Sequence, residues 1–262
     1  MSEFDANIER GREALESGAF GKAVDQLRKA VKLNADSAEA HLLLGEALSE
    51  QGEDAAAIAE FNTGLKLDAE NVDARYALGD CYFATHQFAA ALSTYQDILK
   101  IDPQQADAWV SIGLVHSSHG NAEQALEDYH KALQIDPVSV FALNSLGDIY
   151  YGLGHNEQAL AQYRKVIDLD PDDAQAHFGL CELHYDLEDY AAAEEEGLAA
   201  VRLDPGLTYA WLTLGNICLD EERTEEALNY FQEFLALERS PDAKEICAEV
   251  AAVVAGLKAE LD

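Results

Sequence analysis

Apolar residues recur along the chain with a helical spacing, and the pattern renews itself after a short polar turn. Residues 140–173 show this clearly, because two apolar faces are separated by Gly154. Each face follows the i, i+3, i+4, i+7 spacing of an amphipathic helix. The two sets are Leu143, Leu146 and Tyr150, and then Ala159, Tyr163 and Val166. The segment therefore predicts two helices joined at a glycine that accepts a positive φ.

This two-helix pattern repeats with a period of 34 residues. Glycine stands at 11, 45, 79, 113, 147 and 215, with Cys181 in the missing place, and alanine stands at 23, 57, 91, 125, 159, 193 and 227. Proline follows the second helix at 103, 137, 171 and 205, where it cannot continue a helix. The chain therefore predicts seven repeats, which begin near Phe4, Ala38, Val72, Ala106, Val140, Ala174 and Thr208. Positions within a repeat are numbered below as registers 1 to 34.

The most regular repeat carries the pattern W-x2-L-G-x2-Y followed by A-x3-F, A and P. It is matched by Trp109, Ile112, Gly113, Ala125, Tyr129, Ala132 and Pro137. In this the chain resembles the tetratricopeptide repeat (TPR) family. The resemblance implies an all-α fold, an α-solenoid in which helix pairs stack into a right-handed superhelix. It also implies a concave groove, lined by the first helices, that binds extended peptides.

Two segments depart from the pattern. Repeat 6 has Cys181 in place of glycine and Gly197 in place of the aromatic residue, so we expect its second helix to pack least well. After repeat 7, residues 242–260 predict one more helix with an apolar side. Because the last repeat of a stacked array must cover its apolar face, we expect residues 242–262 to form a C-terminal capping helix. The whole chain, 1–262, then forms a single solenoid domain.

The charge of the chain is strongly negative: 17 Lys and Arg against 50 Asp and Glu give a formal net charge of −33. Such a surface repels nucleic acid and anionic membranes and favours basic partners. No run of 18 apolar residues predicts a membrane span, and the start of the chain lacks the features of a signal peptide. The four cysteines are far apart and form no CxxC motif, which is typical of a reducing, cytoplasmic environment. They are Cys81, Cys181, Cys218 and Cys247.

A rotation of 100° per residue places registers 4, 7, 8 and 11 of each first helix in the core and registers 2, 5, 6, 9, 12 and 13 on another face. These six lining registers hold thirteen acids, where the average for the chain would give about eight, and one base, Arg12. Asp148, at register 9, is expected to point away from the core with its side chain unpacked. Carboxylates beside aromatic rings suit Lys and Arg side chains.

The predicted peptide-binding groove consists of acidic, aromatic and amide side chains at these registers. They are Glu46, Asp73, Tyr76, Asp80, Phe83, Asp107, Phe141, Asn144, Asp148, Tyr151, Phe178, Glu182, Tyr185, Tyr209 and Asn216. The alternative is a solvated groove in a protein whose whole surface is acidic. Family members that capture acidic chaperone tails carry Lys, Asn and Arg on these registers. Since this lining has no lysine, we do not expect such a clamp.

One constellation has the spacing of a metal site. His177, Cys181 and His184 share a helical face at i, i+4 and i+7. All three occupy core registers, so we expect packed side chains, no metal and no cofactor. The sequence contains no phosphate-binding loop, no dinucleotide fingerprint and no Gly-x-Ser-x-Gly motif, and we therefore expect no enzymatic activity.

Two classes of function remain. The first is an adaptor that binds an extended, basic or basic-aromatic segment of a partner protein in the groove. The second is a scaffold that self-assembles through its repeat surfaces. We expect a monomer or a weak homo-oligomer, with neither nucleic acid nor membrane insertion involved.

Overall fold

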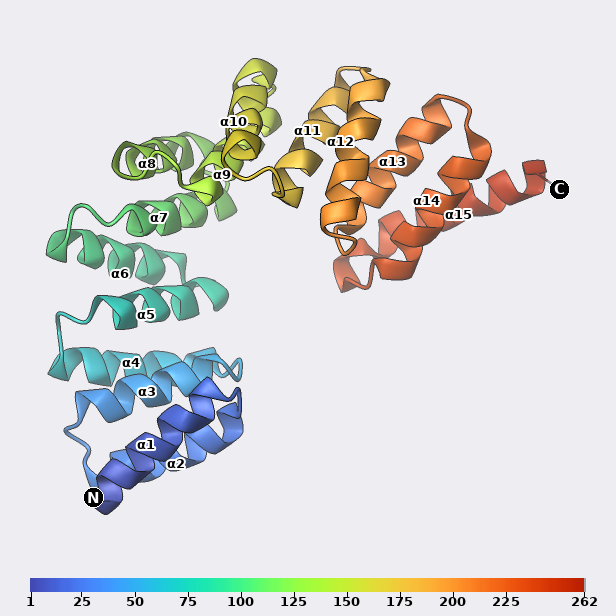
Figure 1. Cartoon of the computed structure of the whole chain (residues 1–262). Coiled ribbons are helices and arrows are strands. Elements are labelled where there is room, and N and C mark those ends of the chain that lie inside the picture. The colour runs from blue at the N-terminus through green and yellow to red at the C-terminus, as the bar shows by residue number, and fades with distance from the viewer. Residues whose placement is uncertain (262) are drawn as a thin grey trace. The chain divides into compact units, whose positions relative to one another are not determined.

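The computed structural model describes residues 1–261, which form fifteen α-helices and one short 3-10 helix, with no β-strand among them. The chain divides into two compact modules (Figure 1). The N-terminal module is Met1–Pro137, and the C-terminal module begins at Val138. In both modules, successive helices form antiparallel pairs, and each pair corresponds to one predicted repeat. The predicted all-α solenoid architecture is confirmed.

The N-terminal module contains four helix pairs. Their bounds are α1 (Glu3–Glu16) and α2 (Phe20–Leu33), α3 (Ala38–Ser49) and α4 (Asp54–Leu67), α5 (Val72–Ala84) and α6 (Phe88–Ile101), and α7 (Ala106–Ser118) and α8 (Ala122–Ile135). Short polar side chains begin several of these helices. Ser2, Ser37 and Asn71 each accept a hydrogen bond from a backbone N–H of the first turn, which satisfies a donor that the helix itself leaves free.

The C-terminal module contains three further pairs and an additional helix. Their bounds are α9 (Val140–Gly152) and α10 (Asn156–Leu169), α11 (Ala174–Asp186) and α12 (Tyr190–Leu203), α13 (Thr208–Asp220) and α14 (Thr224–Leu237), followed by η1 (Pro241–Ala243) and α15 (Lys244–Leu261). From the second pair of the chain onward, every first helix begins at the residue where the sequence pattern places the start of a repeat. The registers defined from the sequence therefore apply to the structure without adjustment.

The turn between the paired helices has a left-handed residue at register 15. Gly18, Gly52, Gly120 and Gly154 have φ between 70° and 78°, which is the positive φ that the sequence pattern predicts for Gly154. In repeats 3, 6 and 7 the same conformation is adopted by His86, Glu188 and Glu222, with φ of 58° or 59°. The turn geometry is thus common to all seven repeats even where glycine is absent.

Helix pairs approach closely because a glycine at register 8 faces a large side chain at register 24. A Cβ atom added to Gly147 would lie 2.4 Å from a ring carbon of Tyr163, and one added to Gly79 would lie 2.3 Å from a ring carbon of Tyr95. Both distances are far shorter than a normal contact between carbon atoms. The glycine is therefore needed for space, and its loss would push the two helices apart.

Repeat 6 reverses this arrangement, and the expectation that its second helix packs least well is wrong. Cys181 replaces the glycine and is fully buried, while Gly197 replaces the aromatic residue. A Cβ atom on Gly197 would lie 2.9 Å from the Cys181 sulfur. The larger and the smaller residue have exchanged places between the two helices, so the pair remains closely packed.

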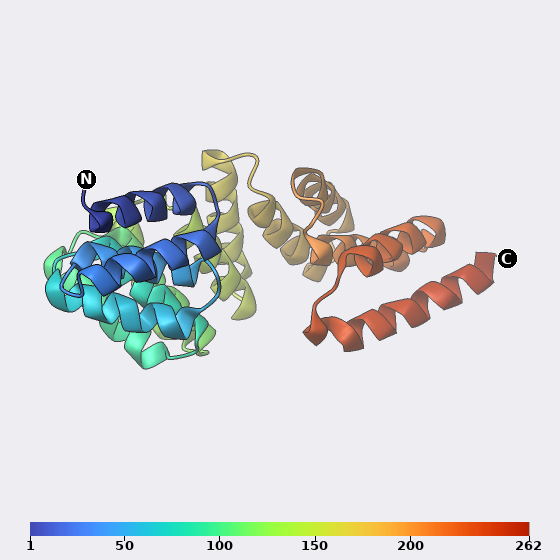
Figure 2. The same cartoon turned by 90° about the horizontal axis from the view of Figure 1, so that it is seen from below.

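The additional helix α15 packs on α14, as the views in Figures 1 and 2 both show. Val250, Val254 and Leu257 are buried in one cluster with Phe231 and Phe234. The other side of α15 is exposed, and Val253 retains 37% of its accessible surface. This helix covers the apolar face that repeat 7 would otherwise present to solvent.

Candidate functional site

In the N-terminal module, the predicted lining residues lie on α3, α5 and α7. Glu46, Asp73, Asp80 and Asp107 are exposed, and Tyr76 and Phe83 are half-buried beside them. The ring of Tyr76 packs against that of Tyr95 with the two centroids 6.4 Å apart. The first-helix face of this module therefore presents carboxylates with aromatic rings beside them.

In the C-terminal module, the corresponding residues lie on α9, α11 and α13. Phe141, Asp148 and Tyr209 are exposed. Asn144, Tyr151, Glu182, Tyr185 and Asn216 are half-buried.

Phe178 does not belong to this surface. It is only 8% exposed and packs with Val201, Ala210 and Leu214. Register 5 is close enough to the core face for a large apolar side chain to turn inward, so the placement of Phe178 in the groove is wrong.

Asp148 accepts a hydrogen bond from a buried tyrosine of the paired helix. The hydroxyl group of Tyr163, a residue only 1% exposed, donates to Oδ1 of Asp148 over 2.8 Å. Tyr95 donates in the same way to Oδ1 of Asp80 over 2.6 Å. The expectation that Asp148 is exposed is correct, but the expectation that its side chain is unpacked is wrong. The carboxylate also satisfies a hydroxyl group that would otherwise be buried without an acceptor.

A second set of tyrosine–carboxylate bonds links successive first helices of the C-terminal module. Tyr151 of α9 donates to Oδ2 of Asp186 in α11 over 2.6 Å. Tyr185 of α11 donates to Oδ2 of Asp220 in α13 over 2.9 Å. Each bond runs from register 12 of one repeat to register 13 of the next. The carboxylates of this face are thus held in fixed positions, with other lone pairs still free.

Glu182 lies among these carboxylates and has no hydrogen-bond or ion-pair partner within residues 1–261. Burial, and then the negative charges of Asp148 and Asp186, raise the pKa of Glu182 to about 7. Partial desolvation also raises the pKa of Asp148, although the hydrogen bond from Tyr163 acts in the opposite direction. Because a nearby cation favours the charged form of each carboxyl group, this cluster is electrostatically suited to receive one.

Arg12 shows how a cation is held on the same face. It occupies register 9 of repeat 1, and its Nη2 atom lies 2.6 Å from Oε1 of Glu39. The hydrogen bond to Glu39 raises the pKa of the Arg12 guanidinium, and the charges of Glu9 and Glu46 contribute in the same direction. A guanidinium group is therefore accommodated by carboxylates at the lining registers.

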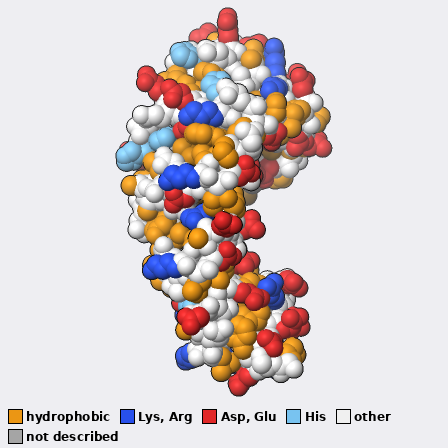
Figure 3. Space-filling model, turned by 90° about the vertical axis from the view of Figure 1, so that its left-hand side faces the viewer, with side chains coloured by type: hydrophobic (Ala, Val, Ile, Leu, Met, Phe, Trp, Pro, Cys, Tyr) orange, Lys and Arg blue, Asp and Glu red, His pale blue; other side chains and the backbone are white. Residues whose placement is uncertain are grey.

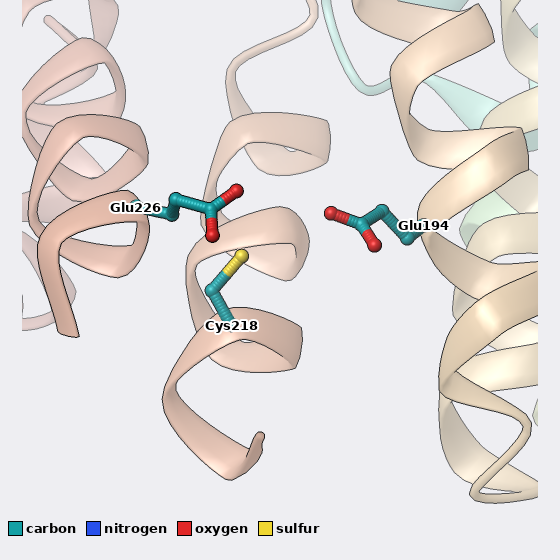
Figure 4. Close-up of side chains that lie close together, drawn as sticks. All are labelled: Glu194, Cys218 and Glu226. Atoms are coloured by element: carbon teal, nitrogen blue, oxygen red, sulfur yellow. The ribbon is translucent and has the colours of Figure 1, made fainter. Parts of the chain in front are cut away.

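Glu194, Cys218 and Glu226 form a cluster whose composition resembles a metal site. Figure 4 shows their side chains directed toward one another from α12, α13 and α14. Nη1 of Arg223 lies 2.8 Å from Glu194 and 3.1 Å from Glu226, so a cation already occupies this position. Burial raises the pKa of the Cys218 thiol to about 11, which opposes the thiolate that a metal requires. We therefore interpret the cluster as an ion-pair network that joins repeats 6 and 7.

The predicted helical face of His177, Cys181 and His184 is occupied by internal contacts. Nδ1 of His177 lies 2.6 Å from Oε2 of Glu196, and its Nε2 lies 3.1 Å from the carbonyl oxygen of Pro171. Nδ1 of His184 lies 3.8 Å from Asp189. Both ring nitrogens of His177 thus have partners within the fold, as expected for packed side chains.

Comparison with known proteins supports the family that the sequence pattern resembles. Four family models, each described as tetratricopeptide repeat, match residues 8–71 and 144–208, 55–111, 104–172, and 210–245. No curated protein matches the chain significantly. Among the described residues, no helix has the length and apolar character needed to cross a membrane.

Several solved structures share the fold. A tetratricopeptide repeat protein from Parabacteroides merdae ATCC 43184 aligns over 96% of this chain and 98% of its own, with a TM-score of 0.77 and 18% identity. A MamA protein aligns over 66% of this chain and 94% of its own, with a TM-score of 0.59 and 26% identity.

YrrB, described as a TPR protein with an unusual peptide-binding site, aligns over 70% of this chain and 95% of its own, with a TM-score of 0.53 and 22% identity. The family models together extend over nearly the whole chain, and the helix pairs have the fold of these structures. The chain therefore belongs to the tetratricopeptide repeat family.

Proposed function

We propose that this protein is a non-enzymatic adaptor that binds an extended basic-aromatic segment of a partner protein on the first-helix faces of its repeats. TPR proteins generally mediate protein–protein interactions. The observation that carries the proposal is the set of oriented carboxylates on α9, α11 and α13, held by Tyr151, Tyr163 and Tyr185 around the unpaired Glu182.

The chemistry of the ligand follows from this arrangement. A carboxylate that accepts one tyrosine proton keeps lone pairs for an ammonium or guanidinium group, and fixing it in place reduces the entropy lost on binding. Exposed aromatic side chains such as Phe141 and Tyr209 offer ring faces for cation–π contacts and for aromatic residues. Arg12 beside Glu39 is an intramolecular example of the same pairing.

A defined peptide tests the proposal. An acetylated and amidated hexapeptide of alternating Arg and Tyr is titrated into the full chain by calorimetry, and an uncharged hexapeptide of alternating Gln and Tyr serves as the control. We expect the basic peptide to bind and its affinity to fall as salt is raised, because exposed charges are screened over about 8–10 Å at 0.1–0.15 M salt. Equal binding of both peptides would contradict the proposal. Light scattering on the free chain tests the alternative scaffold function, which requires growth in mass with concentration.

A further inference from the structure

One hydrogen bond recurs at the loops between repeats. The side chain at register 4 bonds to the carbonyl oxygen at register 32 of the preceding repeat. The bonds are His41 Nε2 to Ala35 at 3.0 Å, Arg75 Nη2 to Ala69 at 2.5 Å, His177 Nε2 to Pro171 at 3.1 Å, and Trp211 Nε1 to Pro205 at 3.0 Å. Arg75 thus occupies the place that imidazole or indole rings occupy in other repeats.

In repeats 2 and 6, the register-4 side chain also meets a glutamate at register 23. Nδ1 of His41 lies 2.6 Å from Glu60, and Nδ1 of His177 lies 2.6 Å from Glu196. Repeat 3 has the permanently charged Arg75 at register 4 but Thr94 at register 23. The carboxylate that faces the basic side chain in the other two repeats is therefore missing here.

A cavity of about 300 Å³ lies between α4, α5 and α6 beside this position. Its lining includes Lys66, Arg75, Tyr82, Ser93, Thr94 and Asp97. The single acid, Asp97, does not replace the missing glutamate. It bonds to Lys100 over 2.7 Å, and its Oδ2 lies 3.9 Å from Nη1 of Arg75, too far for a hydrogen bond. The guanidinium group therefore retains donors that no protein acceptor uses.

Two further polar groups of the cavity, Lys66 and Tyr82, offer donors. Lys66 lines the cavity and forms no ion pair within residues 1–261, so its ammonium group is open to a further acceptor. The Tyr82 hydroxyl accepts a hydrogen bond from Asn62 over 3.0 Å, which leaves its own proton available. The face of the molecule in Figure 3 shows Lys and Arg side chains recurring among hydrophobic ones. The cavity is thus a local cationic site in an acidic protein.

We propose that this cavity binds one carboxylate group, supplied by an acidic side chain of a peptide, in the place that Glu60 and Glu196 occupy in repeats 2 and 6. Repeats 2 and 6 identify the chemistry of the ligand, because in both a glutamate at register 23 faces the basic side chain at register 4. The site is formed by second helices and register 4, so it is separate from the lining registers of the first helices. The N-terminal module would then have a second binding surface, which prefers acidic side chains where the first-helix face prefers basic ones.

The test introduces the missing carboxylate into the cavity by a substitution at register 23 of repeat 3. Thr94→Glu is expected to fill the cavity, raise the melting temperature and weaken binding of an acetylated, amidated hexaglutamate peptide at least about tenfold in calorimetric titration at low salt. Gln96→Glu is the matched control, since it adds the same charge to the exposed side of α6 outside the cavity. We expect its affinity for the peptide to stay within about twofold of that of the unmodified chain.

Two further variants keep the result decisive if Thr94→Glu does not fold. Lys66→Ala is expected to weaken hexaglutamate binding several-fold without changing the helical circular dichroism signal, and Thr94→Val to leave binding intact. Hexaglutamate that fails to bind the unmodified chain, or binds Lys66→Ala as tightly, would overturn the proposal. Inorganic phosphate that binds more tightly than the peptide would also overturn it, because the site would then select a different anion.

Discussion

The hydroxyl group of Tyr163 donates a hydrogen bond to Asp148, and the same bond joins Tyr95 to Asp80. Both pairs connect register 24 of a second helix with register 9 of the first. Aspartate occurs at register 9 only in repeats 3 and 5, and both carry tyrosine at register 24. The acid that faces solvent is therefore also a structural acceptor for a buried group.

This pair predicts a strong coupling in a double-mutant cycle. Asp148→Lys should cost about 1–3 kcal/mol of unfolding free energy, because lysine cannot accept the hydrogen bond of the buried hydroxyl. In a Tyr163→Phe background the same substitution should cost much less. Urea denaturation of the two single variants and the double variant measures the coupling. Additive effects would mean that the hydrogen bond contributes nothing to stability.

The carboxyl group of Glu182 should make the free energy of unfolding depend on pH. The pKa of its carboxyl group is raised to about 7 in the folded chain, above the value of about 4.3 expected after unfolding. The folded state therefore binds the proton more tightly, and this contribution to stability is complete below about pH 4 and is lost as the pH rises through 7.

Glu182→Gln removes the ionisation and should raise the melting temperature at pH 8 while changing it little at pH 5. Glu157→Gln, on the exposed side of α10, is the control with the same chemical change. Equal shifts for both variants at both pH values would show that the environment of Glu182 has no special effect.

The glycine at register 8 predicts a large difference between two Gly→Ala substitutions in α9. At Gly147 the added methyl group meets the ring of Tyr163 and should cost about 1–3 kcal/mol by overpacking. At Gly152 it meets nothing within 4 Å, and the substitution should stabilise the helix by about 0.5–1 kcal/mol. Thermal denaturation distinguishes the two, and a similar effect at both positions would refute the close-approach explanation.

The contact of α15 with α14 predicts opposite results for neighbouring valines. Val254→Asp places a charge in the cluster with Phe231 and Phe234, and should lower the melting temperature and cause aggregation. Val253 lies on the exposed side of α15, and Val253→Asp should change the free energy of unfolding by no more than about 0.5 kcal/mol. Melting curves and size-exclusion chromatography report both effects. If Val254→Asp behaves like Val253→Asp, α15 does not serve as a cap.

The repeat pattern predicted the helix pairs, their starting residues and the turn glycines, because steric requirements recur at fixed registers. It did not predict the bonds from Tyr151 to Asp186 and from Tyr185 to Asp220, which depend on side-chain reach between successive repeats. The placement of Phe178 failed because register 5 borders the core and rotation angle alone does not decide which way a large ring turns. The cavity beside Arg75 could have been noticed from the sequence, since Thr94 stands where Glu60 and Glu196 accompany a basic residue.

The most direct test of the binding account is neutralisation of the first-helix carboxylates of the C-terminal module. The triple variant Asp148→Asn, Glu182→Gln and Asp186→Asn, compared at pH 8 where Glu182 is mostly ionised, removes three carboxylates but keeps hydrogen-bond acceptors for Tyr163 and Tyr151. Its control removes three exposed acids of the second helices, Glu157→Gln, Asp168→Asn and Glu195→Gln.

Calorimetric titration with the Arg-Tyr hexapeptide at low salt compares the two variants with the unmodified chain. The account predicts that the first-helix variant binds at least about tenfold more weakly, while the second-helix control stays within about twofold. Equal loss of affinity in both variants would contradict it, because binding would then follow the net charge of the protein and not the arranged carboxylates of α9 and α11.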